Sequence, residues 1–275
     1  MVNIQEWIEK SQTGLSNFRK SESWILKKLR EIKAYSQVLL QKNQIPEQKF
    51  VIFAYGRSGS TLLVKLLNNH QKIHCEEEIL HSRFYGKMLF PSLYVQGRAV
   101  KFSSKVYGFK VKIFQLAEEQ NIDPEKFLLN LYRDRWKIIY LKRNNILRSQ
   151  ISALLGISRN QMHATSKSKL KNKKIIINCE QLLVGLQRRE IYQIKEQEIL
   201  KNLDHIKVIY EEDLLLTENH QKTSDRIFNY LGLDSVPVKT NLVKTTSNQL
   251  SDVIENYEEV VEKLSQTKYA KFLHD

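Results

Sequence analysis

The stretch Lys49-Phe-Val-Ile-Phe-Ala-Tyr-Gly-Arg-Ser-Gly-Ser-Thr-Leu-Leu63 decides the fold of this chain. It begins with a continuous apolar run, which is typical of a strand buried on both faces. A glycine-containing turn follows at Gly56, and from Thr61 the apolar residues recur at helical spacing. A strand, a turn and a helix in this order predict one repeating unit of a parallel α/β sheet.

The same alternation continues along the chain. Apolar, β-branched runs predict further strands at 107–113, 136–141, 174–178 and 206–210, and helical patterns lie between them at 124–133, 146–155, 179–203 and 223–231. Strands that are apolar throughout need cover on both faces. The sequence therefore predicts a three-layer α/β fold, with a parallel sheet between two layers of helices.

Residues 1–48 differ in composition from the rest of the chain. Their pattern predicts an N-terminal amphipathic helical appendage, which leaves 49–275 as the main domain. Apolar residues follow one helical stripe, and Pro46 ends the pattern. The stripe consists of Ile25, Leu29, Ile32, Tyr35 and Leu39. We interpret this helix as a packing arm, with a partner-binding element as the alternative.

The composition is that of a globular protein. Of 275 residues, 41% are hydrophobic and 27% are charged, so a sizeable core can be buried. Two cysteines, Cys75 and Cys179, exclude a disulfide-stapled scaffold and fit a reducing compartment. The first residues do not resemble an export signal, and no apolar run reaches the roughly 18 residues of a membrane span. We expect a soluble, cytoplasmic protein; nothing in the sequence indicates its oligomeric state.

The net charge of +14, from 44 Lys and Arg against 30 Asp and Glu, raises the question of nucleic acid. The densest cluster, 167–174, has no aromatic residue interleaved for base stacking. Zinc-finger spacings and basic-zipper heptads are also absent from the sequence. We interpret the excess as a solvated lysine background with no nucleic-acid partner, and a non-enzymatic basic binding protein stays as an alternative that rests on charge alone.

The glycine turn after the first strand predicts an anion site. Backbone N–H groups and the positive end of the helix dipole converge there. Arg57 adds a cation, Ser58, Ser60 and Thr61 add hydroxyls, and Gly59 gives the backbone room to turn. A plain glycine turn is the competing interpretation.

A nucleoside-triphosphate loop would need a lysine where this chain has Ser60, and a first glycine where it has Ala54. The missing lysine weakens a P-loop kinase or NTPase, which we keep as the alternative enzyme.

Arg143 follows the predicted strand 136–141 directly, at the carboxyl edge of the sheet, where open α/β folds bind ligands. A cation is disfavoured at the start of the helix that follows, because that end already carries partial positive charge. Its presence there predicts a bound anion.

The segment 55–63 resembles the 5′-phosphosulfate loop of the sulfotransferases that use 3′-phosphoadenosine 5′-phosphosulfate (PAPS). Further stretches agree: 67–80, 107–112, 138–153, 208–214, 240–246 and 250–256. The resemblance covers about 49–275 and is nearest to the bacterial carbohydrate and glycolipid enzymes. It implies a P-loop, nucleotide-kinase-like fold and transfer of a sulfuryl group from PAPS to a hydroxyl of a carbohydrate, lipid or other metabolite, without a metal.

The resemblance also implies roles for single residues in holding the donor. Arg143 and Ser152 match its 3′-phosphate motif, with Ser149 as the rival hydroxyl. Tyr210 matches a position that contacts the adenine, and Lys244 matches a basic residue of the C-terminal loop. Arg57 and the loop amides are the natural donors to the leaving phosphate.

For the base that takes the acceptor's proton, the resemblance points to Glu78. Its neighbours Glu76, Glu77, His74 and His81 stay open as alternatives. Lys110 and Lys112 lie two residues apart on a predicted strand and so share one face, which we expect to lie toward the ligand. The histidines and Cys75 follow no zinc-binding spacing, so we expect no metal site.

Overall fold

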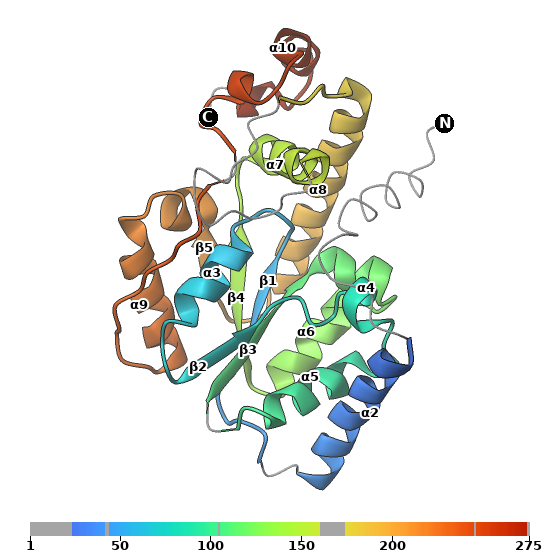
Figure 1. Ribbon diagram of the computed structural model, residues 1–275, viewed down its shortest axis with the longest axis vertical. Coiled ribbons are helices and arrows are strands. Elements are labelled where there is room, and N and C mark those ends of the chain that lie inside the picture. Colours follow the sequence, from blue (N-terminus) through green and yellow to red (C-terminus); the bar gives the residue numbers. More distant parts are fainter. Residues whose placement is uncertain (1–23, 42–43, 104, 160–173, 245, 274–275) are drawn as a thin grey trace. The chain divides into compact units, whose positions relative to one another are not determined.

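The computed structural model describes residues 24–41, 44–103, 105–159, 174–244 and 246–273 (Figure 1). The chain divides into two compact units, each built from separate stretches. Of the described residues, the smaller comprises those within Asn145–Glu190 and Asn241–Asp275, and the larger comprises those within Ser21–Asn144 and Ile191–Thr240. The predicted domain boundary at residue 48 stays a prediction.

The larger unit contains a five-stranded sheet in the order β2-β3-β1-β4-β5, with every neighbouring pair parallel. Its strands are β1 (Lys49–Ala54), β2 (Ile73–Glu76), β3 (Val106–Lys112), β4 (Trp136–Lys142) and β5 (His205–Ile209). The chain leaves β1 toward one edge, to reach β2, and leaves β4 toward the other, to reach β5. The carboxyl ends of β1 and β4 are therefore the topological switch point, the place where such sheets bind ligands.

Helices connect the strands. The α-helices are α2 (Trp24–Leu40), α3 (Ser60–Leu67), α4 (Ser82–Tyr85), α5 (Pro91–Val100), α6 (Pro124–Arg133), α7 (Ile146–Ser158), α8 (Cys179–Leu200), α9 (Asn219–Leu231) and α10 (Tyr257–Ser265). Two short π-helices, η2 (Gln115–Glu119) and η4 (Tyr210–Leu214), follow β3 and β5. The 3-10 turns η5 (Leu250–Asp252) and η6 (Ala270–Phe272) flank α10.

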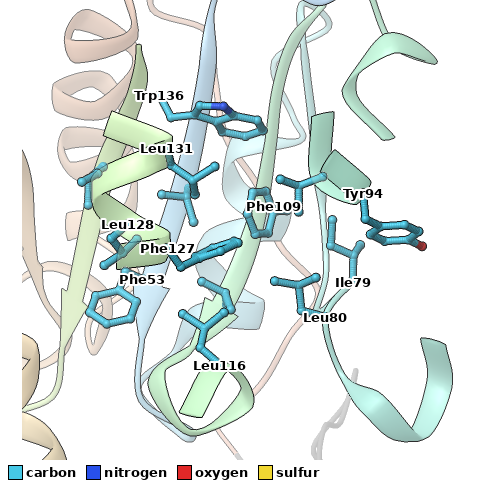
Figure 2. Close-up of a cluster of buried hydrophobic side chains, with 14 of the residues drawn as sticks. Phe53, Ile79, Leu80, Tyr94, Phe109, Leu116, Phe127, Leu128, Leu131 and Trp136 are labelled. Atoms are coloured by element: carbon cyan, nitrogen blue, oxygen red, sulfur yellow. The ribbon is translucent and has the colours of Figure 1, made fainter. Parts of the chain in front are cut away.

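Both faces of the sheet are covered, because alternate residues of each strand enter different apolar clusters. Phe53 of β1 and Phe109 of β3 face α5 and α6, where Phe127 and Trp136 join them (Figure 2). The neighbouring β1 residue Ile52 faces the other way, with the apolar residues of α3 and α9. The predicted fold class, a parallel α/β sheet between two helical layers, is confirmed.

The smaller unit has its own apolar cluster, built from α7, the first part of α8 and α10. The predicted strand at 174–178 is wrong. Ile175 and Ile177 are buried but Ile176 is 71% exposed, so this segment has one inward face only. It forms a single parallel bridge, between Ile175 and Ile254, in place of a sheet strand.

Two further differences concern the N-terminal half. Strand β2 was not predicted, because four residues at the edge of a sheet carry too short a pattern. The expected helix exists as α2, but it packs through Glu31, Ala34 and Val38, and most of the predicted apolar stripe is exposed.

Among the described residues, no helix is long and apolar enough to cross a membrane.

Candidate functional site

The loop after β1 turns the chain sharply into α3. Arg57 and Gly59 have φ values of 65° and 91°, both in the left-handed region. The Ser58 hydroxyl, which is buried, donates a hydrogen bond to the carbonyl oxygen of Tyr55 at 2.8 Å and so closes the turn. Ser60 then begins α3. The loop therefore places the N-terminus of α3 at the carboxyl edge of β1, next to the switch point.

Gly59 packs against Tyr210, the residue that follows β5. A Cβ atom at Gly59 would lie 2.6 Å from Cδ2 of Tyr210 and 3.4 Å from Cδ1 of Leu214. Real Cβ contacts are never that short, and φ of 91° is itself strained for any residue with a side chain. Glycine is therefore required at this position on two independent grounds, and Tyr210 lies directly against the loop.

Arg143 joins the loop to the other side of the switch point. Its Nη1 donates a hydrogen bond to the carbonyl oxygen of Arg57 at 3.0 Å, and its guanidinium lies 4.4 Å from the ring centre of Tyr210. The side chain is only 9% exposed. Glu211 balances part of the charge, with Oε1 at 3.7 Å from Arg143 Nε, and its other oxygen accepts from the backbone N–H of Asn144. Residues distant in sequence, Arg57, Arg143 and Tyr210, are thus in one place.

The two arginines make this place electropositive. Burial, and secondly the neighbouring charge of Arg143, lower the pKa of Arg57 to about 10. The Arg57 guanidinium therefore stays charged at neutral pH. Two like charges held together at a helix N-terminus repel each other, and an anion between them relieves that repulsion. The arrangement fits a ligand with more than one negative group.

Glu78 lies in the same unit, after β2, between two lysines of β3. Lys112 Nζ is 2.7 Å from its Oε2 and Lys110 Nζ is 3.3 Å from its Oε1. Gln115 Nε2 also donates to Oε2 at 2.7 Å. Burial alone would raise the pKa of Glu78, but the two lysines outweigh burial and hold that pKa well below its ordinary value. Glu78 is therefore ionised at neutral pH.

Lys110 connects Glu78 to the loop. Its Nζ donates to Thr61 Oγ1 at 2.7 Å and also contacts the exposed carboxylate of Glu77. Burial lowers the pKa of Lys110, but the two glutamates outweigh burial and raise it. Lys110 and Lys112 share one face of β3, as their spacing predicts, and that strand lies between β2 and β1 inside the sheet.

The sequence did not reveal the part that Gln115 plays. Its side chain is fully buried, its Nε2 donates to Glu78, and its Oε1 accepts from the backbone N–H of Lys112 at 3.0 Å. Gln115 thereby fixes both members of the Glu78–Lys112 pair. A lone glutamine at the start of a π-helix carries no motif, so only the folded chain shows this role.

Aromatic rings lie next to this pair. The Tyr55 ring centre is 5.6 Å from that of Phe114 and 5.8 Å from that of Tyr192, and Lys112 Nζ is 5.4 Å from the Phe114 ring centre. Tyr55 also begins the loop itself. Apolar ring surface therefore borders the Glu78–Lys112 pair beside the loop that follows β1.

Three other predicted site residues belong to the smaller unit. Ser152 and its rival Ser149 lie on α7 and are buried, and Ser149 Oγ accepts a hydrogen bond from Arg189 at 2.8 Å. Lys244 is exposed, and its Nζ donates to Asn248 at 2.7 Å. Their part in an anion site stays a prediction.

The histidines near Glu78 have structural contacts. His74 stacks on Phe102 with ring centres 3.5 Å apart, and His70 Nδ1 accepts from the backbone N–H of Lys72. His81 Nδ1 lies 2.9 Å from Glu119. Within the described ranges, no group of three or more His, Cys, Asp or Glu side chains is placed to hold a metal ion.

The chain is similar to solved structures, one of which is a sulfotransferase. No protein-family model matches the chain, and no curated protein matches it. The crystal structure of mouse sulfotransferase SULT7A1 complexed with PAP is similar over 88% of this chain and 94% of that one, at 14% sequence identity and a TM-score of 0.45.

Proposed function

We propose that this chain is a sulfotransferase that uses PAPS. It transfers the sulfuryl group to a hydroxyl of a carbohydrate, lipid or other metabolite, and residues 49–275 form the sulfotransferase domain. Cys75 and Cys179 are free thiols, in keeping with the predicted cytoplasmic location. The acceptor class follows from the sequence resemblance.

The observation that carries this proposal is the Arg57–Arg143 pair. Arg57 follows β1 and precedes α3, Arg143 follows β4, and Arg143 donates to the Arg57 carbonyl. A donor with a phosphosulfate at one position and a phosphate at another supplies the separate negative groups that such a pair attracts. The loop also lacks the lysine that a triphosphate loop requires.

Different residues of the chain would bind different parts of this donor. Arg57 and the amides of the loop 56–61 bind the 5′ phosphosulfate, and Arg143 binds the 3′ phosphate, with Ser152 and Lys244 as further proposed contacts. Tyr210, held under Arg143 and against Gly59, offers a ring face to the adenine. When bound, PAPS supplies an activated sulfuryl group whose S–O bond to the 5′ phosphate breaks as a new S–O bond to the acceptor forms.

Charge then develops on the leaving phosphate and on the acceptor oxygen. Arg57 and the loop amides stabilise the first, as fixed donors do at an oxyanion. Glu78 accepts the acceptor's proton and is ionised for this role, because Lys110 and Lys112 hold its pKa low. The same low pKa makes Glu78 a weaker base. The two lysines therefore reduce its basicity, but they keep the carboxylate deprotonated and in position.

The experiment is an activity screen. The purified chain is incubated with PAPS and with pools of hydroxyl-bearing sugars, glycolipids and small metabolites, and mass spectrometry follows the products. The proposal expects an acceptor that gains one SO₃ unit together with an equal amount of adenosine 3′,5′-bisphosphate (PAP). Arg57→Ala should remove both products, and Arg133→Ala should keep both, since Arg133 is exposed at the end of α6, before the amino end of β4. Products that form equally with Arg57→Ala would contradict the proposal.

A further inference from the structure

Helix α2 presents an apolar face to solvent. Seven large apolar side chains of this helix are exposed, with exposed fractions from 52% to 83%: Trp24, Ile25, Leu26, Leu29, Ile32, Leu39 and Leu40. They recur at helical spacing along 17 residues, about 25 Å of helix. Exposed apolar residues scattered singly are ordinary, but a continuous stripe marks an interaction surface.

This orientation is fixed by the opposite face of α2. Ala34 is buried against α5, where a Cβ atom at Gly97 would lie 1.9 Å from the Ala34 carbonyl oxygen. The two backbones therefore touch, and α2 cannot turn without losing that contact. Glu31, 2% exposed, accepts from Lys28 at 2.6 Å, from Tyr35 at 2.5 Å and from the backbone N–H of Leu89 at 2.8 Å.

The apolar face continues onto the segment between α4 and α5. Leu89 and Phe90 are 73% and 60% exposed, and the Phe90 ring packs edge-on against Tyr35 at 5.8 Å. Both residues are tied to α2, because the N–H of Leu89 donates to Glu31 and the N–H of Phe90 donates to the Tyr35 hydroxyl. We call the stripe together with Leu89 and Phe90 the α2 face.

Cations lie on α2 and on the neighbouring segment. Residues 24–41 and 81–90 contain six of them, Lys27, Lys28, Arg30, Lys33, Arg83 and Lys87. Lys27 and Lys28 are half-buried: Lys27 donates to the carbonyl oxygen of Arg83, and Lys28 donates to Glu31 and to the carbonyl oxygen of Lys87. The same ranges contain one carboxylate, Glu31, which is buried and fully engaged. Lys33 and Lys87 are exposed. Within these two described ranges, exposed apolar side chains are thus accompanied by the exposed cations Lys33 and Lys87 and by no exposed carboxylate.

We propose that the α2 face binds a lipid surface that carries anionic headgroups. A helix lying in the plane of a membrane buries its apolar side chains at the acyl boundary and places lysines and arginines among the headgroups. Trp24, 70% exposed at the start of α2, suits the interface between the two zones. A second copy of the chain fits less well, because pairing two such faces brings their cations together. This inference is independent of the sulfotransferase proposal.

The test is co-sedimentation of the full chain with vesicles. One set is phosphatidylcholine alone and the other contains about 30% phosphatidylserine, a composition with a strongly negative surface. We expect binding to the anionic vesicles and little to the neutral ones. Equal binding to both sets, or to neither, would overturn the proposal.

Two variants locate the surface. Leu29→Ser/Ile32→Ser should weaken binding at least about ten-fold, since it replaces two aliphatic side chains, which would be buried at the acyl boundary, by polar ones. The matched control is Ile191→Ser/Ile194→Ser, which removes two side chains of similar exposure from α8 and should bind as the unaltered chain does. Circular dichroism melts confirm that each variant is folded. Equal binding by the two double variants would refute the assignment to α2.

A charge variant and a measurement without lipid distinguish a lipid surface from a second copy of the chain as the partner of the α2 face. Lys33→Glu should reduce binding to the anionic vesicles and have no effect on the melting temperature. Sedimentation velocity without lipid should show the same mass for the unaltered chain and for Leu29→Ser/Ile32→Ser. A dimer that this double variant dissociates, in a chain that ignores vesicles, would assign the α2 face to a second copy and overturn the lipid proposal.

Discussion

Arg143 donates a hydrogen bond from Nη1 to the carbonyl oxygen of Arg57, 3.0 Å away, and so ties the end of β4 to the loop that follows β1. The charge of Arg143 also lowers the pKa of Arg57, so two cations act on each other at the switch point of the sheet. Arg143 therefore acts in two ways, as a binding group and as a support for the loop. Through either role, removal of the Arg143 side chain should weaken ligand binding at this site.

We expect Arg143→Ala to weaken PAP binding by about 10- to 150-fold, because hydrogen bonds to charged groups contribute roughly 1.5–3 kcal/mol. Isothermal titration measures the affinity. Arg133→Ala removes the same charge from an exposed position and should bind PAP as the unaltered chain does. Equal affinities for all three chains would remove Arg143 from the site.

Gly59→Ala should destabilise the larger unit and disable the loop. Its φ of 91° is strained for alanine, and the new methyl group would press on Tyr210. We expect a loss of about 1–3 kcal/mol in the free energy of unfolding, measured in urea. Gly56→Ala is the matched control. Its Cβ would meet only ordinary contacts, the nearest at 3.8 Å, so its effect should stay within about 1 kcal/mol. Similar losses in both variants would argue against the Tyr210 contact.

Glu78→Gln should reduce turnover by about 10²- to 10⁴-fold while PAP binding persists, because the amide cannot accept the acceptor's proton. Glu77→Gln tests the specificity of this effect, since Glu77 contacts Lys110 as well but is 52% exposed. We expect that variant to keep most of its activity. Once an acceptor is known, steady-state rates decide the matter, and an active Glu78→Gln enzyme would transfer the role of base to another residue.

The low pKa of Glu78 also predicts how stability depends on pH. Its pKa is lower in the folded chain than in the unfolded chain, so its stabilising contribution is complete above the unfolded value of about 4.3 and is lost as the pH falls through the folded value. The stability difference between the unaltered chain and Glu78→Gln should therefore be constant from about pH 6 to 8 and shrink only in acid. Urea unfolding at several pH values measures it. A difference that grows in acid would contradict the lysine-paired carboxylate.

The sequence predicts most of the larger unit because its strands and loop have strong local patterns. β1, β3, β4 and β5 lie within one residue of their predicted starts, and α6 begins and ends where the pattern does. The loop after β1 was predicted by glycines, hydroxyls and an arginine that are consecutive in the chain. Local patterns of this kind need no knowledge of distant contacts.

The parts that the sequence did not predict depend on contacts between distant residues. Gln115 gains its meaning only from Glu78 and Lys112, which the fold brings to it. The face that α2 buries is decided by Gly97, more than 50 residues away, so helical periodicity alone chose the wrong face. The alternation of burial in 174–178 likewise follows from its bridge to Ile254.

The most direct test of the sulfotransferase account compares two nucleotides in one melting experiment. The Arg57–Arg143 pair and the missing triphosphate lysine predict that millimolar PAP raises the melting temperature by several degrees, as a ligand well above its dissociation constant does. Mg-ATP at the same concentration should change it little. The account is supported if PAP stabilises the chain and Arg57→Ala abolishes the shift. It is contradicted if Mg-ATP stabilises the chain and PAP does not, which would favour a kinase or NTPase.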